Sequence, residues 1–145
     1  MLNDQLKVTG DVVVEITGPD GQIKDRREIK NLVVATGKTF IAGRMVGTPT
    51  TMSHMATGSN STAATAADTA LGSELGRVAL SSGVSSGAVV TYAASFPAGT
   101  GTGAVVEAGI FNASSAGVML CRTVFAVVNK GADDAMSITW AITVS

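Results

Sequence analysis

The sequence predicts an all-β protein, an antiparallel β-sandwich of the jelly-roll type with one short helix. Segments rich in Val, Ile and Thr recur at intervals of about 8 to 14 residues, and turns containing Gly, Pro or Asp separate them. No strand-helix-strand alternation occurs, which favours packed antiparallel sheets. The chain has 145 residues, 46% hydrophobic and 14% charged. A single domain over residues 1–145 with a sizeable core is therefore expected.

The first two strands are predicted to form a hairpin. Leu6 to Gly18 contains strand-forming residues with partial alternation, and Gly18-Pro19-Asp20-Gly21 is a strong turn signal. The return segment, Gln22 to Val34, carries six charges between Lys24 and Lys30. This pattern is typical of a solvated hairpin partner or of an edge strand protected by charge. Residues 1–6 precede the hairpin and are expected to form a short arm.

One helix is predicted over Thr36 to Val46, with Thr36 as its N-cap, because apolar residues recur there at helical spacing. Residues 59–69 are small and polar and contain no hydrophobic anchor, which predicts either an exposed loop or an arm ordered by a neighbouring chain. The remaining strands are predicted at Thr51 to Gly58, Glu74 to Ser81, Ala88 to Phe96, Val105 to Asn112, Val118 to Val128 and Ser137 to Val144.

The hydrophobic core can be predicted from alternation. Ser137 to Val144 alternates over its whole length, which places Ile138, Trp140, Ile142 and Val144 on one face of a strand. The complete set expected to supply much of the core is Val12, Val14, Ile16, Val90, Tyr92, Ile110, Phe111, Phe125, Ile138, Trp140 and Ile142.

No residues suggest catalysis, a cofactor or a metal centre. His54 is the only histidine and Cys121 the only cysteine, and each is interpreted as structural. The glycine run from Gly99 to Gly103 lacks the spacing of a phosphate-binding loop. The net charge of −1 argues against nucleic acid as the main partner. No segment resembles a signal peptide or a membrane span. The expectation is a protein that is not an enzyme.

Charged residues are unevenly distributed: 14 of the 21 lie in residues 1–68. Four of the remaining seven stand within apolar or small-residue segments: Glu74, Arg77, Glu107 and Arg122. Because an unpaired buried charge is costly, these residues either pair with one another across strands or face a partner subunit, and pairing is favoured. A glycosidase carboxylate pair is disfavoured, because the chain has few aromatic residues to form a sugar platform.

Three segments carry a resemblance to a known group of proteins. Met52 to Arg77 (MSHMATGSNSTAATAADTALGSELGR), Val90 to Asn112 (VTYAASFPAGTGTGAVVEAGIFN) and Met119 to Ser145 (MLCRTVFAVVNKGADDAMSITWAITVS) are similar to small structural proteins of tailed bacteriophages. Similar segments occur in capsid cement or decoration proteins and in tail-fibre-like proteins. The likeness spans nearly the whole chain but contains no chemical signature.

The resemblance implies a virion structural protein that binds the outer surface of the major capsid protein shell and stabilises the head by bridging capsomers. It further implies a homo-oligomer made in the cytoplasm of the bacterial host. The low charge of the second half also predicts a homotrimer or homodimer, whose contacts involve the small-residue segments and the loop at residues 59–69. No nucleic-acid partner, membrane partner or cofactor is expected. A tail-fibre or tail-tip receptor-binding component is the alternative, but the chain has no heptad stalk or repeated shaft. Candidate partner-interface residues are Leu2, Leu6, Arg26, Arg27, Lys30, Asn60, Thr62 and Thr65.

Overall fold

The computed structural model describes residues 6–145 and is 54% strand and 7% helix. Leu2 and most of the predicted arm lie outside the described residues. The strands are β1 (Val8–Thr17), β2 (Ile23–Val33), β3 (His54–Gly58), β4 (Glu74–Ala79), β5 (Ser82–Ser86), β6 (Val89–Phe96), β7 (Gly103–Phe111), β8 (Met119–Lys130) and β9 (Ala135–Val144). The helix α1 (Ala35–Arg44) follows β2.

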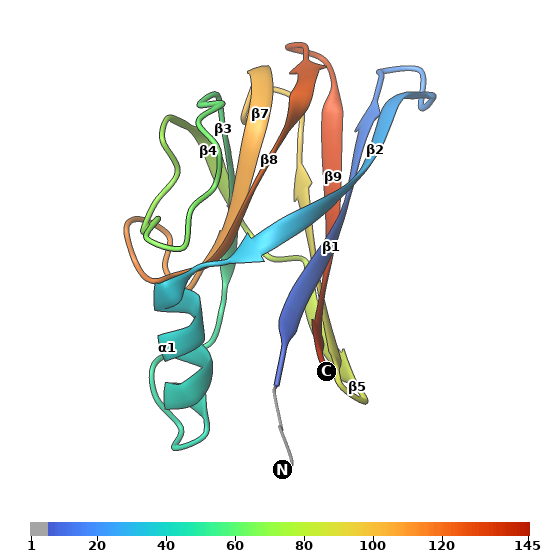
Figure 1. The fold of residues 1–145 in the computed structure, drawn as a ribbon. Coiled ribbons are helices and arrows are strands. Elements are labelled where there is room, and N and C mark those ends of the chain that lie inside the picture. The colour runs from blue at the N-terminus through green and yellow to red at the C-terminus, as the bar shows by residue number, and fades with distance from the viewer. Residues whose placement is uncertain (1–5) are drawn as a thin grey trace.

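All nine strands belong to one curled antiparallel sheet, in the order β4-β3-β7-β8-β2-β1-β9-β6-β5. Strand β2 joins the two halves, because it pairs with β1 along most of its length and with β8 only through Leu32 and Val33. In Figure 1, β2 runs obliquely from the β1 side of the molecule to the top of α1. The predicted class, antiparallel all-β with one short helix, is confirmed.

Strand β2 is a hairpin partner and not the edge strand that was the second expectation for it. This strand is internal in the sheet, and its charges therefore do not protect an edge. The charged part from Lys24 to Lys30 pairs with β1 alone and is a solvated hairpin partner, whereas the apolar end turns onto β8. The predicted turn is also present: the Gly21 N–H donates to the Gly18 carbonyl over 3.0 Å.

The core lies between the two halves of the sheet. Eight of the eleven predicted core residues are at most 4% exposed, and Trp140 is fully buried. Tyr92 and Phe125 are only partly buried but pack against the core, and Val90 is also partly exposed. Val90 and Tyr92 line an open apolar groove beside α1, which explains why their burial is incomplete.

The helix begins one residue earlier than expected, and its N-cap is Val34 rather than Thr36. The Thr36 hydroxyl instead donates to the Met119 carbonyl over 2.9 Å and ties the first turn to β8. Gly37 allows the close contact between helix and strand. A Cβ atom at this position would lie 1.9 Å from the Leu120 carbonyl oxygen.

A methyl group at Gly37 should therefore separate α1 from the sheet. We expect Gly37→Ala to lower the free energy of unfolding by about 1 to 3 kcal/mol, as overpacking usually does, despite the better helix propensity of alanine. Lys38→Ala is the control, because Lys38 is exposed on the same turn of α1. Urea denaturation of both variants is the measurement. A Gly37→Ala protein as stable as the control would contradict the close contact.

Candidate functional site

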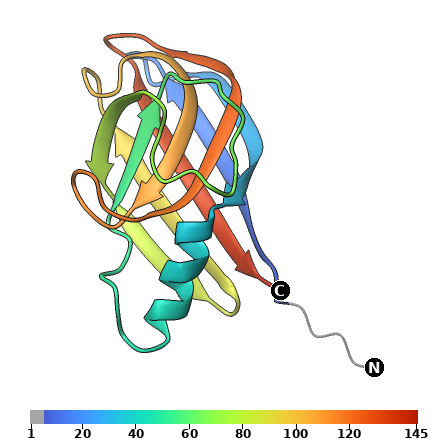
Figure 2. The same cartoon turned by 60° about the vertical axis from the view of Figure 1, so that its left-hand side comes forward.

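The loop between β3 and β4 folds back over the outer surface of the sheet. In Figure 2 this loop, residues 59–73, passes in front of β7 and β8. Its Leu71 packs against Phe111 and Met119 in a second, smaller apolar cluster outside the main core. The cover explains why most of β3, β7 and the first half of β8 is buried without alternation.

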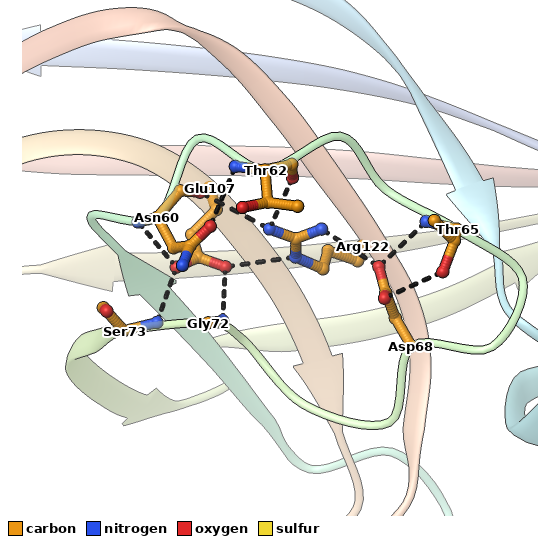
Figure 3. Close-up of polar contacts among 8 residues, drawn as sticks. All are labelled: Asn60, Thr62, Thr65, Asp68, Gly72, Ser73, Glu107 and Arg122. Carbon is orange, nitrogen blue, oxygen red and sulfur yellow. Dashed lines mark hydrogen bonds and ion pairs between the residues drawn. The ribbon is translucent and has the colours of Figure 1, made fainter.

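Glu107 holds the loop from beneath. Its side chain is fully buried and accepts three backbone N–H bonds of 2.9 Å, from Asn60, Gly72 and Ser73. A fourth bond comes from Arg122 Nε over 3.1 Å, so that each carboxylate oxygen accepts two hydrogen bonds. Figure 3 shows the carboxylate between the two ends of the loop. Carboxylate burial of this kind is stable only because the charge is paired and hydrogen-bonded.

Arg122 extends the same network across the loop. Its Nη1 lies 3.0 Å from Asp68 Oδ2, and its Nη2 donates to the Thr62 carbonyl over 3.0 Å. Asp68 in turn accepts bonds from the Thr65 N–H and hydroxyl (Figure 3). We call Glu107, Arg122 and Asp68, together with the loop groups that they bind, the loop clamp.

The register of the sheet brings the two central charges together. Arg122 pairs with Gly109 and Glu107 with Val124, so the two side chains are diagonal neighbours on the outer face of β7 and β8. Gly58 pairs with Glu107 on the other side. A Cβ atom at Gly58 would lie 2.5 Å from Glu107 Oε2, so the glycine leaves the space that the carboxylate occupies.

The loop clamp holds the loop against its own sheet. Residues 59–69 are mostly exposed, as predicted, and they contain no large hydrophobic residue. Buried charges anchor this range instead, and Leu71 anchors the loop just beyond it. The exposed surface of the loop is formed by small side chains such as Thr62 and Thr65. Both carboxylate oxygens of the buried Glu107 are therefore engaged in holding the loop.

The carboxyl group of Asp68 should make stability depend on pH. Burial raises the pKa of Asp68, but bonds from Thr65 and Arg122 outweigh it, and the net pKa lies below its ordinary value of 3.8. A carboxyl group whose folded-state pKa is lowered stabilises the fold above about pH 4, and this contribution disappears as pH falls through the folded-state pKa. Asp68→Asn should therefore lose stability against the wild type at neutral pH and approach it in acid. Denaturant titrations across this range measure the difference, and a constant gap would contradict the prediction.

The other predicted ion-pair residues form a second, separate pair. Arg77 Nη2 lies 2.8 Å from Glu74 Oε1 near the edge of the sheet. The Arg77 guanidinium also stacks 3.9 Å from the centre of the Phe111 ring and donates to the carbonyls of Ala113 and Ala116. The four predicted residues thus form two pairs, Glu74 with Arg77 and Glu107 with Arg122, and only the second is fully enclosed.

The basic interface candidates of the hairpin are paired with acidic residues of their own chain. Arg26 pairs with Glu28, Arg27 with Asp25 and Lys30 with Asp11. The hydrogen bond from Arg27 lowers the pKa of Asp25. Among the other candidates, Leu6 is 76% exposed and Asn60 is half-buried beside the loop clamp. Asn60 and Thr62 are in direct contact, because the Thr62 N–H donates to Asn60 Oδ1 over 2.8 Å.

Two further buried charges, which the sequence pattern did not indicate, flank the turn between β8 and β9. Lys130 is almost fully buried, and its Nζ donates to the Pro97 carbonyl over 2.9 Å. Burial lowers the pKa of Lys130. Asp134, which is also buried, pairs with Lys24 over 3.0 Å and accepts the Gly131 N–H. The Lys24–Asp134 pair fixes the turn between β8 and β9 to the β1–β2 hairpin, and Lys130 ties the end of β8 to the loop after β6.

The single cysteine and the single histidine occupy structural surroundings. Cys121 is fully buried, and burial raises the pKa of its thiol well above the ordinary value. His54 Nδ1 lies 2.8 Å from the Ser53 hydroxyl. Within residues 6–145, no cluster of three His, Cys, Asp or Glu residues has the geometry to hold a metal ion. The helix found in this range is neither long nor apolar enough to cross a membrane.

The three most exposed large apolar side chains of the described residues lie near the end of α1. Met45 is 87% exposed and Val46 81%, directly after the helix, and Leu6 lies across a groove of about 500 Å³ from Met45. Two lysines, Lys7 and Lys38, are the charged residues that line this groove. We call Leu6, Met45, Val46 and the groove the α1-end surface. In Figure 1 the C-terminal end of α1 lies at the same end of the molecule as both described termini.

Comparisons of the chain with protein-family models, with curated proteins and with solved structures find no match.

Proposed function

We propose that this protein is a virion structural protein that binds the outer surface of a bacteriophage capsid and stabilises the head, with the major capsid protein as its partner. It would be made in the cytoplasm of the bacterial host and act without catalysis. Two lines support this proposal: the resemblance of the three sequence segments, and the exposed α1-end surface. The second is the observation that carries a binding role, since apolar side chains grouped at one end of a small domain favour burial against a partner.

The residues of the α1-end surface indicate which chemical groups a complementary partner surface would carry. Met45, Val46 and Leu6 would bury apolar area, which is the dominant favourable term in association. The groove is lined by Lys7 and Lys38, so an apolar patch with acidic side chains at its rim is the complementary surface. The loop clamp contributes indirectly, because a loop fixed in advance has less conformational entropy to lose on binding.

The proposal includes the finer description of the fold as a jelly-roll sandwich. The nested pairing of early with late strands supports it: β1 pairs with β9, β2 with β8 and β3 with β7. In such an arrangement the first half of the chain lies against the second half, as in a long hairpin that has been rolled up.

Substitution of Met45 tests the binding role. Met45→Glu should reduce the number of copies retained on particles of the phage or prophage that encodes this chain by at least about tenfold, because it places a charge in the apolar contact. Ile23→Glu is the matched control, since Ile23 is 58% exposed at the start of β2 and should bind normally. Figure 1 shows the β1–β2 turn at the opposite end of the molecule from α1. Circular dichroism checks that both variants fold. Full occupancy by Met45→Glu would contradict the assignment of the α1-end surface.

A further inference from the structure

Strand β5 is an open edge of the sheet. It is the last strand in the order and pairs only with β6, so among residues 6–145 no strand lies on its other side. All five residues, Ser82–Ser86, are exposed, and the Val84 side chain is 60% exposed. Figure 1 shows β5 at the lower right edge of the molecule, at the same end as α1. An edge of this kind presents unpaired backbone N–H and C=O groups to any strand that approaches.

The usual protections of an edge strand are absent from β5. Natural proteins protect such edges with charged side chains, prolines or β-bulges. The chain has no charged residue between Arg77 and Glu107, and the β5–β6 hairpin contains no proline. Its pairing is regular from Ser82 to Ser86, without a bulge. The opposite edge, β4, differs: it carries the Glu74–Arg77 ion pair and lies near β6.

We propose that β5 pairs with β5 of a second copy of the chain, antiparallel about a two-fold axis, so that the two sheets become continuous. A strand without charges has no like-charge conflict when it meets its own copy, and an isologous two-fold contact makes the same strand serve both sides. The sequence analysis left a homotrimer and a homodimer open, and this proposal specifies a dimer. It does not depend on the capsid as partner.

The register of this contact follows from the length of β5. An axis through Val84 pairs all five residues, whereas any shift leaves some of them unpaired. In this register Val84 lies opposite Val84 of the partner subunit, and Ser82 lies opposite the partner's Ser86. The two exposed valine side chains then cover one another on one face of the joined sheet, which adds apolar burial to the backbone hydrogen bonds.

The mass of the protein in solution is the first test. Sedimentation equilibrium should give the mass of two chains of 14.5 kDa each. Val84→Lys should weaken the dimer by roughly 100-fold, because two ammonium groups would meet on the axis. Val127→Lys should leave it unchanged, since Val127 is similarly exposed (45%) on the internal strand β8. A wild-type monomer or trimer, or a Val84→Lys protein that dimerises normally, would overturn the proposal.

Cross-linking provides a second test, which does not require a variant that weakens the dimer. Directly opposite residues of an antiparallel pair have Cβ atoms about 5 Å apart, close enough for a disulfide after a small adjustment. Val84→Cys should therefore form a covalent dimer under mild oxidation at least about tenfold faster than Val127→Cys. The native Cys121 does not interfere, because it is buried. Equal rates for the two variants would place the contact elsewhere and refute pairing through β5.

Discussion

Replacement of Trp140 by alanine is expected to lower the free energy of unfolding by about 3 to 5 kcal/mol, the usual cost of truncating a fully buried aromatic side chain. Trp140 is the largest fully buried residue, and β9 holds it between Val12 of β1 and Tyr92 of β6. Its indole Nε1 has no hydrogen-bond partner among the described residues. The loss is therefore one of packing and apolar burial, with no hydrogen bond removed.

Thermal unfolding measures this loss. For a chain of this length, the expected change corresponds to a fall in Tm of roughly 10 to 20 °C. Thr139→Ala is the matched control, because Thr139 precedes Trp140 on β9 and is exposed on the opposite face. The control should stay within about 0.5 kcal/mol of the wild type, apart from small strand-propensity effects. An unchanged Tm for Trp140→Ala would show that the two halves of the sheet do not enclose this ring.

Glu107→Gln is expected to destabilise the protein by about 3 to 5 kcal/mol, although it changes hardly any volume. All four hydrogen-bond partners of the carboxylate are donors. The glutamine amide would point its own NH₂ donor at some of these donors, which would then lose their acceptor. Arg122 would also lose its buried counter-charge. The loop from residue 59 to residue 73 should detach before the rest of the sheet unfolds.

Glu74→Gln is the control for this effect. It removes the same charge from the more exposed pair with Arg77, where ion pairs contribute at most about 1 kcal/mol. Denaturant unfolding gives the two free energies, and limited proteolysis reports on the loop, which should become sensitive only in Glu107→Gln. Equal stability losses in the two variants, with the loop equally protected, would show that the loop clamp does not anchor the loop.

The sequence predicts best those strands that have one buried face and one exposed face. β9 alternates because one face meets the core and the other meets solvent, so the pattern over Ser137 to Val144 placed Ile138, Trp140 and Ile142 correctly. β5 was missed because it is exposed on both faces and its serine and glycine residues carry no hydrophobic pattern. The N-cap was placed at Thr36 because a local hydroxyl signal cannot reveal that this side chain reaches the Met119 carbonyl.

The candidate site was predictable in part. Glu107 and Arg122 were identified because isolated charges in apolar segments need partners, and the structure brings them within 3.1 Å of one another. The other groups of the loop clamp were not found. Three of the bonds to Glu107 come from backbone N–H groups, which leave no trace in a sequence, and Asp68 looked like one more polar residue of a loop. Contacts of this kind are set by tertiary structure rather than by residue type.

The number of copies of this protein on purified particles tests the central claim most directly. Quantitative mass spectrometry of particles of the encoding phage or prophage, scaled to the major capsid protein, gives this number. The proposed function predicts hundreds of copies per particle, as expected for a protein repeated over the capsid surface. A few copies to a few dozen would place it in the tail, as the receptor-binding alternative requires, and no copies at all would contradict a role in the virion.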